Sequence, residues 1–153
     1  LEGIVKHAVV VCPLLREEFT ASRGTGAQLN ARRIRVSDIE EFWQSMFGLN
    51  NAGVNLDDFC KMQRTLIEAG AEMRLSGCSS LDIIGVAAGR LQGGWCAMPD
   101  SLSMAAARLL LVEAGGLLGT ETGNPDLGKG SELIFGNPRI FKQLLKLRQA
   151  VTR

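Results

Sequence analysis

From about residue 42 onward, segments with the pattern of a strand alternate with segments with the pattern of a helix, and this alternation constrains the fold more than any other feature. Such alternation is typical of a sheet with helices packed against its faces. We therefore predict an α/β fold, a layered sheet with flanking helices, over residues 38–153. The region contains no internal repeat and no low-complexity tract.

The helices of this region are indicated by apolar stripes and by the residues at their ends. Ser79 and Asp82 have the spacing of a capping box, which predicts that one helix begins just after Gly77. Glycine ends other helices, and proline opens the last one, as is common at those positions. Helices are expected at residues 57–69, after Gly77, at 102–114 and from Pro138, and strands at residues 42–47, 93–97 and 132–135, with a break at Gly48.

Residues 1–37 have a different pattern, that of an antiparallel sheet. Residues 4–12 are rich in β-branched side chains, and residues 13–16 begin with a proline that is typical of a turn. A second strand is expected at 19–21 and a third extended piece at 34–36. We expect an N-terminal antiparallel β-hairpin that is the remnant of a larger sheet.

Size and composition exclude several classes of protein. With 153 residues, 46% of them hydrophobic, the chain can form one core, and we expect a single domain. Its 17 basic and 16 acidic residues nearly cancel, so nucleic acid is not an expected partner. No apolar run reaches the roughly 20 residues of a membrane-spanning helix, so no membrane is expected. The basic cluster near the C-terminus is interpreted as solvated surface: Lys142, Lys146, Arg148 and Arg153.

The cysteines are interpreted as reduced thiols in the cytoplasm or another reducing compartment. The four are far apart in the sequence, and the chain has a single histidine, so no local zinc or Cys-x-x-Cys motif can form. Cys78 and Cys96 are expected to be small buried hydrophobes rather than reactive thiols, because no histidine lies near either of them.

Blocks of sequence along nearly the whole chain carry a family resemblance. They are Val9–Pro13, Glu17–Asn30, Arg33–Ser37, Arg74–Asp82, Val86–Arg90, Pro99–Ala106, Glu113–Gly116 and Ile134–Pro138. In order and spacing they resemble the C-terminal half of the inositol monophosphatase family, the magnesium-dependent, lithium-sensitive phosphomonoesterases. The resemblance implies the C-terminal part of that family's αβαβα fold, with residues 38–72 the weakest match.

The resemblance also implies where a metal site would lie. Most of the family's magnesium ligands come from its N-terminal half, including an Asp-Pro-x-x-Gly-Thr-like loop that this sequence lacks. One further ligand is the aspartate of a Trp-Asp pair, and the neighbouring blocks place Leu102 and Ser103 at that pair. A serine hydroxyl is a poor magnesium ligand compared with a carboxylate. Asp100, nearly one helical turn earlier, could approach the same face, or Asp100 or Ser101 could simply cap the helix.

Substrate contacts in the family come from a loop that matches residues 77–79 and from an acid at the end of the next strand. Gly77 fits this pattern, Cys78 replaces a more usual serine or threonine, and Cys96 occupies the position of the acid. The backbone amides at the start of the Ser79 helix could bind an anion, or the segment could be an ordinary capped helix. Both readings stay open.

Three functions follow from these patterns. The first is an inositol-monophosphatase-family protein, truncated and catalytically inactive on its own, with a degenerate site and no magnesium bound by this chain alone. The alternative is a non-catalytic structural or assembly subunit of a larger complex, either a homo-oligomer or bound to a partner chain. The third is an active phosphatase on inositol or sugar phosphates, with the missing carboxylates supplied by another chain or by sequence before Leu1. No catalytic residue is assigned, and Glu113 is interpreted as part of a helix end.

Overall fold

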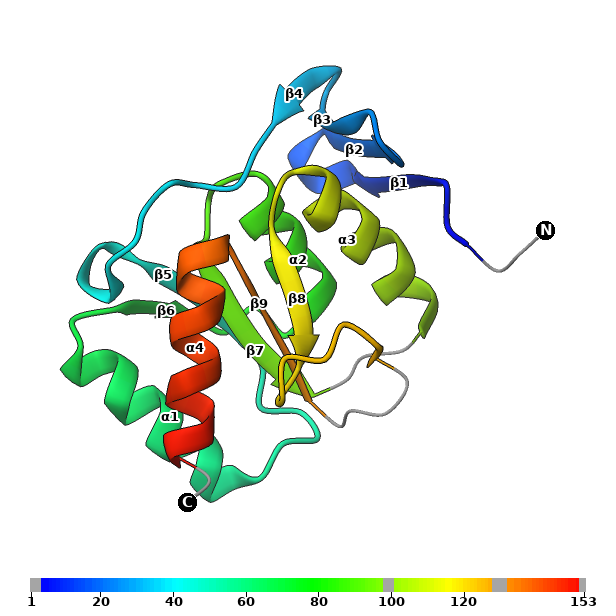
Figure 1. Ribbon diagram of the computed structural model, residues 1–153. Coiled ribbons are helices and arrows are strands. Elements are labelled where there is room, and N and C mark those ends of the chain that lie inside the picture. The colour runs from blue at the N-terminus through cyan, green and yellow to red at the C-terminus, as the bar shows by residue number, and fades with distance from the viewer. Residues whose placement is uncertain (1–3, 98–100, 128–131, 152–153) are drawn as a thin grey trace.

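The computed structural model describes residues 4–97, 101–127 and 132–151. In these ranges a four-stranded antiparallel sheet packs on two helices, which pack in turn on a five-stranded sheet whose other face carries two more helices (Figure 1). The predicted α/β fold, a layered sheet with flanking helices and an antiparallel N-terminal part, is confirmed.

The first sheet is larger than the predicted hairpin. Gly26 opens a strand that was not predicted, and the sheet has four strands in sequence order, each antiparallel to the next. Alternation turns Ala8, Phe19 and Ala27 inward and leaves Val9 exposed on the outer face. The strands are β1 (His7–Cys12), β2 (Glu17–Ser22), β3 (Gly26–Leu29) and β4 (Arg32–Ile34), and a 3₁₀ turn, Pro13–Leu15, joins the first two.

The second sheet has the strand order β6-β5-β7-β9-β8. Strand β5 is parallel to β6 and β7, whereas β9 is antiparallel to β7 and β8. The strands are β5 (Met46–Leu49), β6 (Glu72–Arg74), β7 (Gly93–Ala97), β8 (Leu117–Thr120) and β9 (Glu132–Gly136).

The predicted strand at residues 42–47 is partly wrong. Residues Phe42–Gln44 form a 3₁₀ helix, and Gly48 lies inside β5 instead of ending it. The reason is close packing, because a Cβ atom at Gly48 would lie 2.6 Å from the side chain of Asp82. A glycine within a strand often marks such an approach rather than a break.

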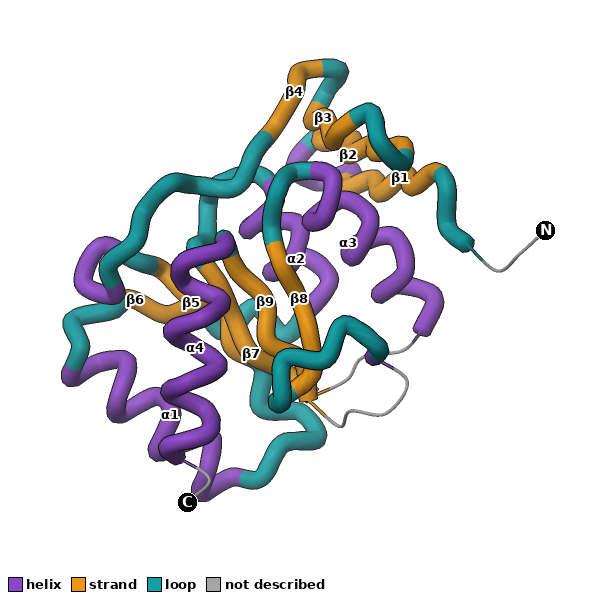
Figure 2. The backbone as a smooth tube through the Cα atoms, in the orientation of Figure 1, coloured by secondary structure: helices purple, strands orange, loops and turns teal. Residues whose placement is uncertain are grey.

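In the described ranges, four α-helices cover the two faces of the second sheet, as can be followed in Figure 2. They are α1 (Leu56–Glu68), α2 (Ser79–Ala87), α3 (Ser101–Glu113) and α4 (Pro138–Val151). The side chain of Asn137 caps α4 by accepting from the amide of Ile140 at 2.9 Å. The capping box predicted for α2 is wrong, because its cap residue is Cys78, with no side-chain capping bond, and Asp82 bonds elsewhere.

Adjacent residues of β7 face opposite cores. Trp95 packs with Phe59 and Ile140 on the side of α1 and α4, and Cys96 packs with Ile84 on the side of α2 and the antiparallel sheet. The two-residue period of a strand produces this division. None of the helices in the described ranges is long and apolar enough to cross a membrane.

Glu113 ties the end of α3 to the antiparallel sheet. Its Oε1 accepts from the amide of Gly24 at 2.7 Å and its Oε2 from the amide of Gly26 at 2.8 Å. These backbone bonds, that of Gly24 above all, hold the pKa of the Glu113 carboxyl below its usual range. An ion pair between Arg90, which follows α2, and Glu17 of β2 also links the helices to this sheet, with N–O distances of 2.5 and 3.0 Å. The carboxylate of Glu113 therefore has a structural role, as the sequence indicated.

We predict that Glu113→Gln lowers the free energy of unfolding at pH 7 by about 1 kcal/mol, because the charged acceptor of two amide bonds is lost. A depressed pKa contributes stability above the unfolded-state pKa, and that contribution disappears as the pH falls through the folded-state value. Urea unfolding at pH 7 and in acid should therefore show a difference at pH 7 that shrinks in acid. Glu41→Gln, at an exposed side chain, is the matched control; equal effects of the two variants would contradict the assignment.

Candidate functional site

The candidate site lies at the edge of the second sheet where the three parallel strands end. Ligands of open α/β sheets bind outside the carboxyl ends of such strands. The loops after β5 and β6 lead there, each into the start of a helix. Strand β9 runs the other way, so its first residue, Glu132, lies at the same edge as Ala97, its register partner at the end of β7.

Ser79 and Cys96, both predicted as substrate contacts, come together at this edge. The Ser79 hydroxyl accepts a hydrogen bond from the Asn50 side-chain amide at 3.1 Å, and it is also hydrogen-bonded to the Cys96 thiol. Burial raises the pKa of Cys96 to about 11, an effect that the bond with Ser79 partly opposes. The thiol is therefore protonated at neutral pH and offers neither a thiolate nor the negative charge of an acid.

Asp82 is a carboxylate that acts electrostatically on Cys96 at this edge, and its role was missed from sequence. It is buried, with 4% of its surface exposed, and it packs against the backbone of Gly48. The Ser76 hydroxyl donates to its Oδ1 at 2.8 Å. Burial raises the pKa of Asp82, and the bond from Ser76 opposes the rise. The signal in the sequence was Gly48, whose missing side chain makes room for the carboxyl group.

Of the other predicted site residues, Gly77 and Cys78 directly precede Ser79 at this edge, whereas Ser103 lies on α3. Gly77 has a left-handed backbone, with φ of 72°, in the turn before α2. Cys78 is exposed, so its interpretation as a buried hydrophobe is wrong; it caps α2 at the sheet edge, where a loop faces solvent. Ser103 is exposed in the first turn of α3, and Asp100 lies outside the described residues. Across the described ranges, no three His, Cys, Asp or Glu side chains converge as metal ligands would.

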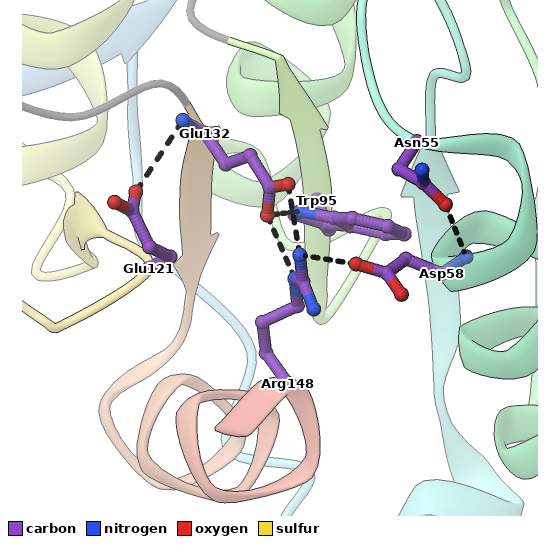
Figure 3. Close-up of polar contacts among 6 residues, drawn as sticks. All are labelled: Asn55, Asp58, Trp95, Glu121, Glu132 and Arg148. Carbon is purple, nitrogen blue, oxygen red and sulfur yellow. Dashed lines mark hydrogen bonds and ion pairs between the residues drawn. The ribbon is translucent and has the colours of Figure 1, made fainter. Parts of the chain in front are cut away.

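A buried charge network lies on the other face of β7 (Figure 3). Arg148 donates from Nε to Glu132 Oε2 at 2.7 Å and from Nη2 to Glu132 Oε1 at 2.9 Å, and Nη2 also donates to Asp58 Oδ2 at 3.0 Å. Trp95 Nε1 donates to Glu132 Oε2 at 2.8 Å, and its ring centroid lies 5.0 Å from the guanidinium.

The prediction of a solvated Arg148 is wrong, because only 5% of this residue is exposed. Sequence reasoning grouped it with Lys142 and Lys146, yet residue 148 lies on the apolar face of α4, one turn after the buried Leu144. The hydrogen bonds to Glu132 raise the pKa of Arg148 further and keep it charged. Both oxygens of the Glu132 carboxylate accept hydrogen bonds from Arg148, and one also accepts from Trp95. This carboxylate therefore has a structural role in the network.

Known proteins match the chain over nearly its whole length. A sequence model of the inositol monophosphatase family matches residues 1–153. The Nus factor SuhB of Pseudomonas aeruginosa is 41% identical over 149 residues, which cover 94% of this chain and 55% of that protein. A putative Nus factor SuhB of Neisseria meningitidis is 31% identical over 152 residues, which cover 97% of this chain and 58% of that protein.

Solved structures agree with these relatives. The extragenic suppressor protein suhB of Bartonella henselae is 30% identical with a TM-score of 0.88, covering 97% of this chain and 58% of that one. The inositol monophosphatase of Thermotoga maritima is 27% identical, also with a TM-score of 0.88, and the match covers 98% of this chain and 58% of that one. The chain thus spans between half and two thirds of the length of the relatives it matches.

We predict that Asp82→Asn raises the free energy of unfolding at pH 7. A carboxyl group whose pKa is raised by burial favours folding below the unfolded-state pKa of about 3.9 and loses that contribution as the pH rises through the folded-state value. The asparagine keeps an acceptor for Ser76 without the cost of a buried charge. Urea unfolding of both proteins between pH 4 and 7 measures the effect; a lower stability of the variant at pH 7 would show that the charge itself stabilises the loop.

Proposed function

This chain belongs to the inositol monophosphatase family, and from that premise we propose that these 153 residues keep the family's fold without its phosphatase chemistry. The observation that carries the proposal is the environment of Cys96. Where the family resemblance calls for an acid, this chain has a buried, protonated thiol hydrogen-bonded to Ser79. The hydroxyl of Ser103, where an aspartate is expected, supports the same conclusion.

The described residues do not fit a magnesium ion. In a phosphomonoesterase, bound magnesium neutralises the phosphoryl oxygens and lowers the pKa of the attacking water. Magnesium prefers hard oxygen ligands, chiefly carboxylates. At the one ligand position expected in this part of the fold the chain offers the hydroxyl of Ser103, and Cys96 stands where a substrate-contacting acid is expected. Asp82 is buried against Gly48 and bonded to Ser76. We therefore assign no catalytic step to these side chains.

The first test is thermal unfolding with and without magnesium. A ligand stabilises a protein only by binding its folded state, by about 2.7 kcal/mol at a concentration of 100 times Kd. We expect millimolar magnesium chloride to leave the Tm unchanged relative to potassium chloride of equal ionic strength, and no release of phosphate from inositol monophosphate. An upward shift of Tm specific to magnesium, or magnesium-dependent phosphate release, would overturn the proposal.

A second candidate function is that of a non-catalytic assembly subunit. Two of the relatives are named as Nus factors and not by an enzymatic activity. In this chain, several large apolar side chains of the first sheet face solvent, among them Val9 and the fully exposed Leu14. Exposed apolar groups that lie together favour binding to another protein surface. In this proposal the protein acts by binding another protein through its exposed apolar side chains, and the sheet edge with Ser79 and Cys96 has no catalytic role.

The assembly role predicts which substitutions impair the cell. In a strain whose growth is slowed by loss of the gene, Ser103→Ala should restore growth as fully as the wild type, because the assembly role requires no catalysis by this hydroxyl. Leu14→Ser combined with Leu15→Ser should fail to restore it while the purified variant keeps its Tm, since both side chains are exposed. Growth rates and protein levels measure the outcome; loss of rescue by a stable Ser103→Ala protein would favour a catalytic role.

A further inference from the structure

The loop between β5 and α1, residues 50–55, crosses the sheet edge of the candidate site. At its start, Asn50 N donates to Trp95 O of β7 at 3.2 Å. Farther along, Gly53 reaches the last residue of β7, because a Cβ atom at Gly53 would lie 3.1 Å from the Cβ of Ala97. This loop, the strap, therefore lies across the carboxyl end of β7. Ligands of open α/β sheets bind outside such strand ends, so the strap occupies part of that place.

The start of the strap is bonded to side chains that the sequence indicated as substrate contacts. The side-chain amide of Asn50 donates to the Ser79 hydroxyl at 3.1 Å. Ser79 is also hydrogen-bonded to the thiol of Cys96, which is 2% exposed. On the side of α2, the strap is thus held by the same hydroxyl that holds Cys96.

The end of the strap is fixed on the opposite face of β7 (Figure 3). Asn55 Oδ1 accepts from the amide of Asp58 at 3.1 Å and so caps α1. The Asp58 carboxylate accepts from Arg148 Nη2 at 3.0 Å, in a pair whose side chains are 20% and 6% exposed. Because Arg148 is bonded to Glu132, this ion pair ties the end of the strap to β9.

We propose that the strap is a gate of the candidate site, closed in this structure, and that the ion pair between Asp58 and Arg148 is its latch. Entry of a ligand to Ser79 and Cys96 requires the strap to lift from the end of β7. The middle of the strap suits such a motion, because residues 51–53 are exposed. Loops with few buried contacts open locally at a lower free energy than the whole fold.

The surroundings of Arg148 distinguish a latch from a general brace of the fold. Without Asp58, the guanidinium keeps two hydrogen bonds to Glu132 and the face of the Trp95 ring at 5.0 Å. The remaining pair of Arg148 and Glu132 has no net charge, so α4 stays on the sheet. Loss of Asp58 therefore frees the start of α1 and the strap before it, and leaves the rest of the molecule in place.

The hydrogen bonds and the ion pair that hold the strap all lie within the second sheet and its helices. They do not depend on residues 1–37. A gate goes beyond the proposed function, because it would control entry to the site with or without phosphatase chemistry. The two fail separately: magnesium-dependent phosphate release would overturn the loss of chemistry and leave the gate in place.

The first test compares Asp58→Ala with Asp57→Ala in the purified chain. Both remove a carboxylate from the first turn of α1, but Asp57 is exposed, whereas Asp58 forms the latch. The reporters are strap amides that are hydrogen-bonded when the strap is closed, those of Asn50, Ala52 and Val54. Their hydrogen exchange, measured by NMR, should be roughly tenfold faster in Asp58→Ala, because a hydrogen bond to a charged group is lost. Asp57→Ala should exchange like the wild type.

Amides inside α2 separate a local opening from a weaker fold. In Asp58→Ala they should exchange at the wild-type rate, and low concentrations of urea should leave the exchange of the strap unchanged, since a local opening exposes little surface. Equal acceleration in α2 and the strap would mean that Asp58 only braces the fold, and wild-type exchange in the strap would mean that Asp58 is no latch. Either result overturns the proposal.

The thiol of Cys96 and a second variant provide an independent readout. Gly53→Ala should open the strap from its middle, because Gly53 has a φ of 78° and the new Cβ would press on Ala97. Gly24→Ala is the matched control, with the same φ of 78° and no neighbouring atom within 4 Å of the new Cβ. N-ethylmaleimide should label Cys96 roughly tenfold faster in Gly53→Ala and Asp58→Ala than in the wild type, and no faster in Gly24→Ala. Wild-type labelling of Cys96 in both strap variants, or equal labelling in the two glycine variants, overturns the proposal.

Discussion

The buried guanidinium of Arg148 imposes a condition on one whole side of the molecule. An arginine without water needs anionic and hydrogen-bonding partners, and a buried pair that loses one member is destabilised by about 3–5 kcal/mol. Those partners are Glu132, Asp58 and the face of Trp95, and each comes from a different element. Helices α1 and α4 and strands β7 and β9 must therefore meet at one place, which fixes the position of both helices on the sheet.

The opposite face of β7 is organised without charge pairing. Cys96 and Ser79 form a neutral contact there, and the carboxyl group of Asp82 is accommodated by a glycine and one hydroxyl. Among the described residues, these side chains at the sheet edge that holds ligands in α/β folds bond to one another or to a neighbouring hydroxyl.

The sequence was informative where the pattern is local. The alternation of strands and helices, the helix of residues 57–69 and the strand at 93–97 could be predicted, because periodicity and end residues are properties of short segments. The family resemblance was readable for the same reason. Tertiary packing decided the rest: Gly48 lies within a strand because Asp82 packs on it, and Asp82 bonds to Ser76 instead of capping α2. Strand β6, three residues with charged ends, has too little pattern to be recognised.

The environment of Trp95 gives the protein a built-in optical probe. The chain has two tryptophans and no tyrosine, and Trp43 is 65% exposed whereas Trp95 is completely buried, stacked on Phe59 and facing Arg148. Their emission spectra should differ, with the red-shifted light of a hydrated indole from Trp43 and a blue-shifted band from Trp95. Replacing Trp43 by phenylalanine would leave a single emitter whose spectrum follows the assembly of α1, α4 and the sheet, separately from the antiparallel sheet.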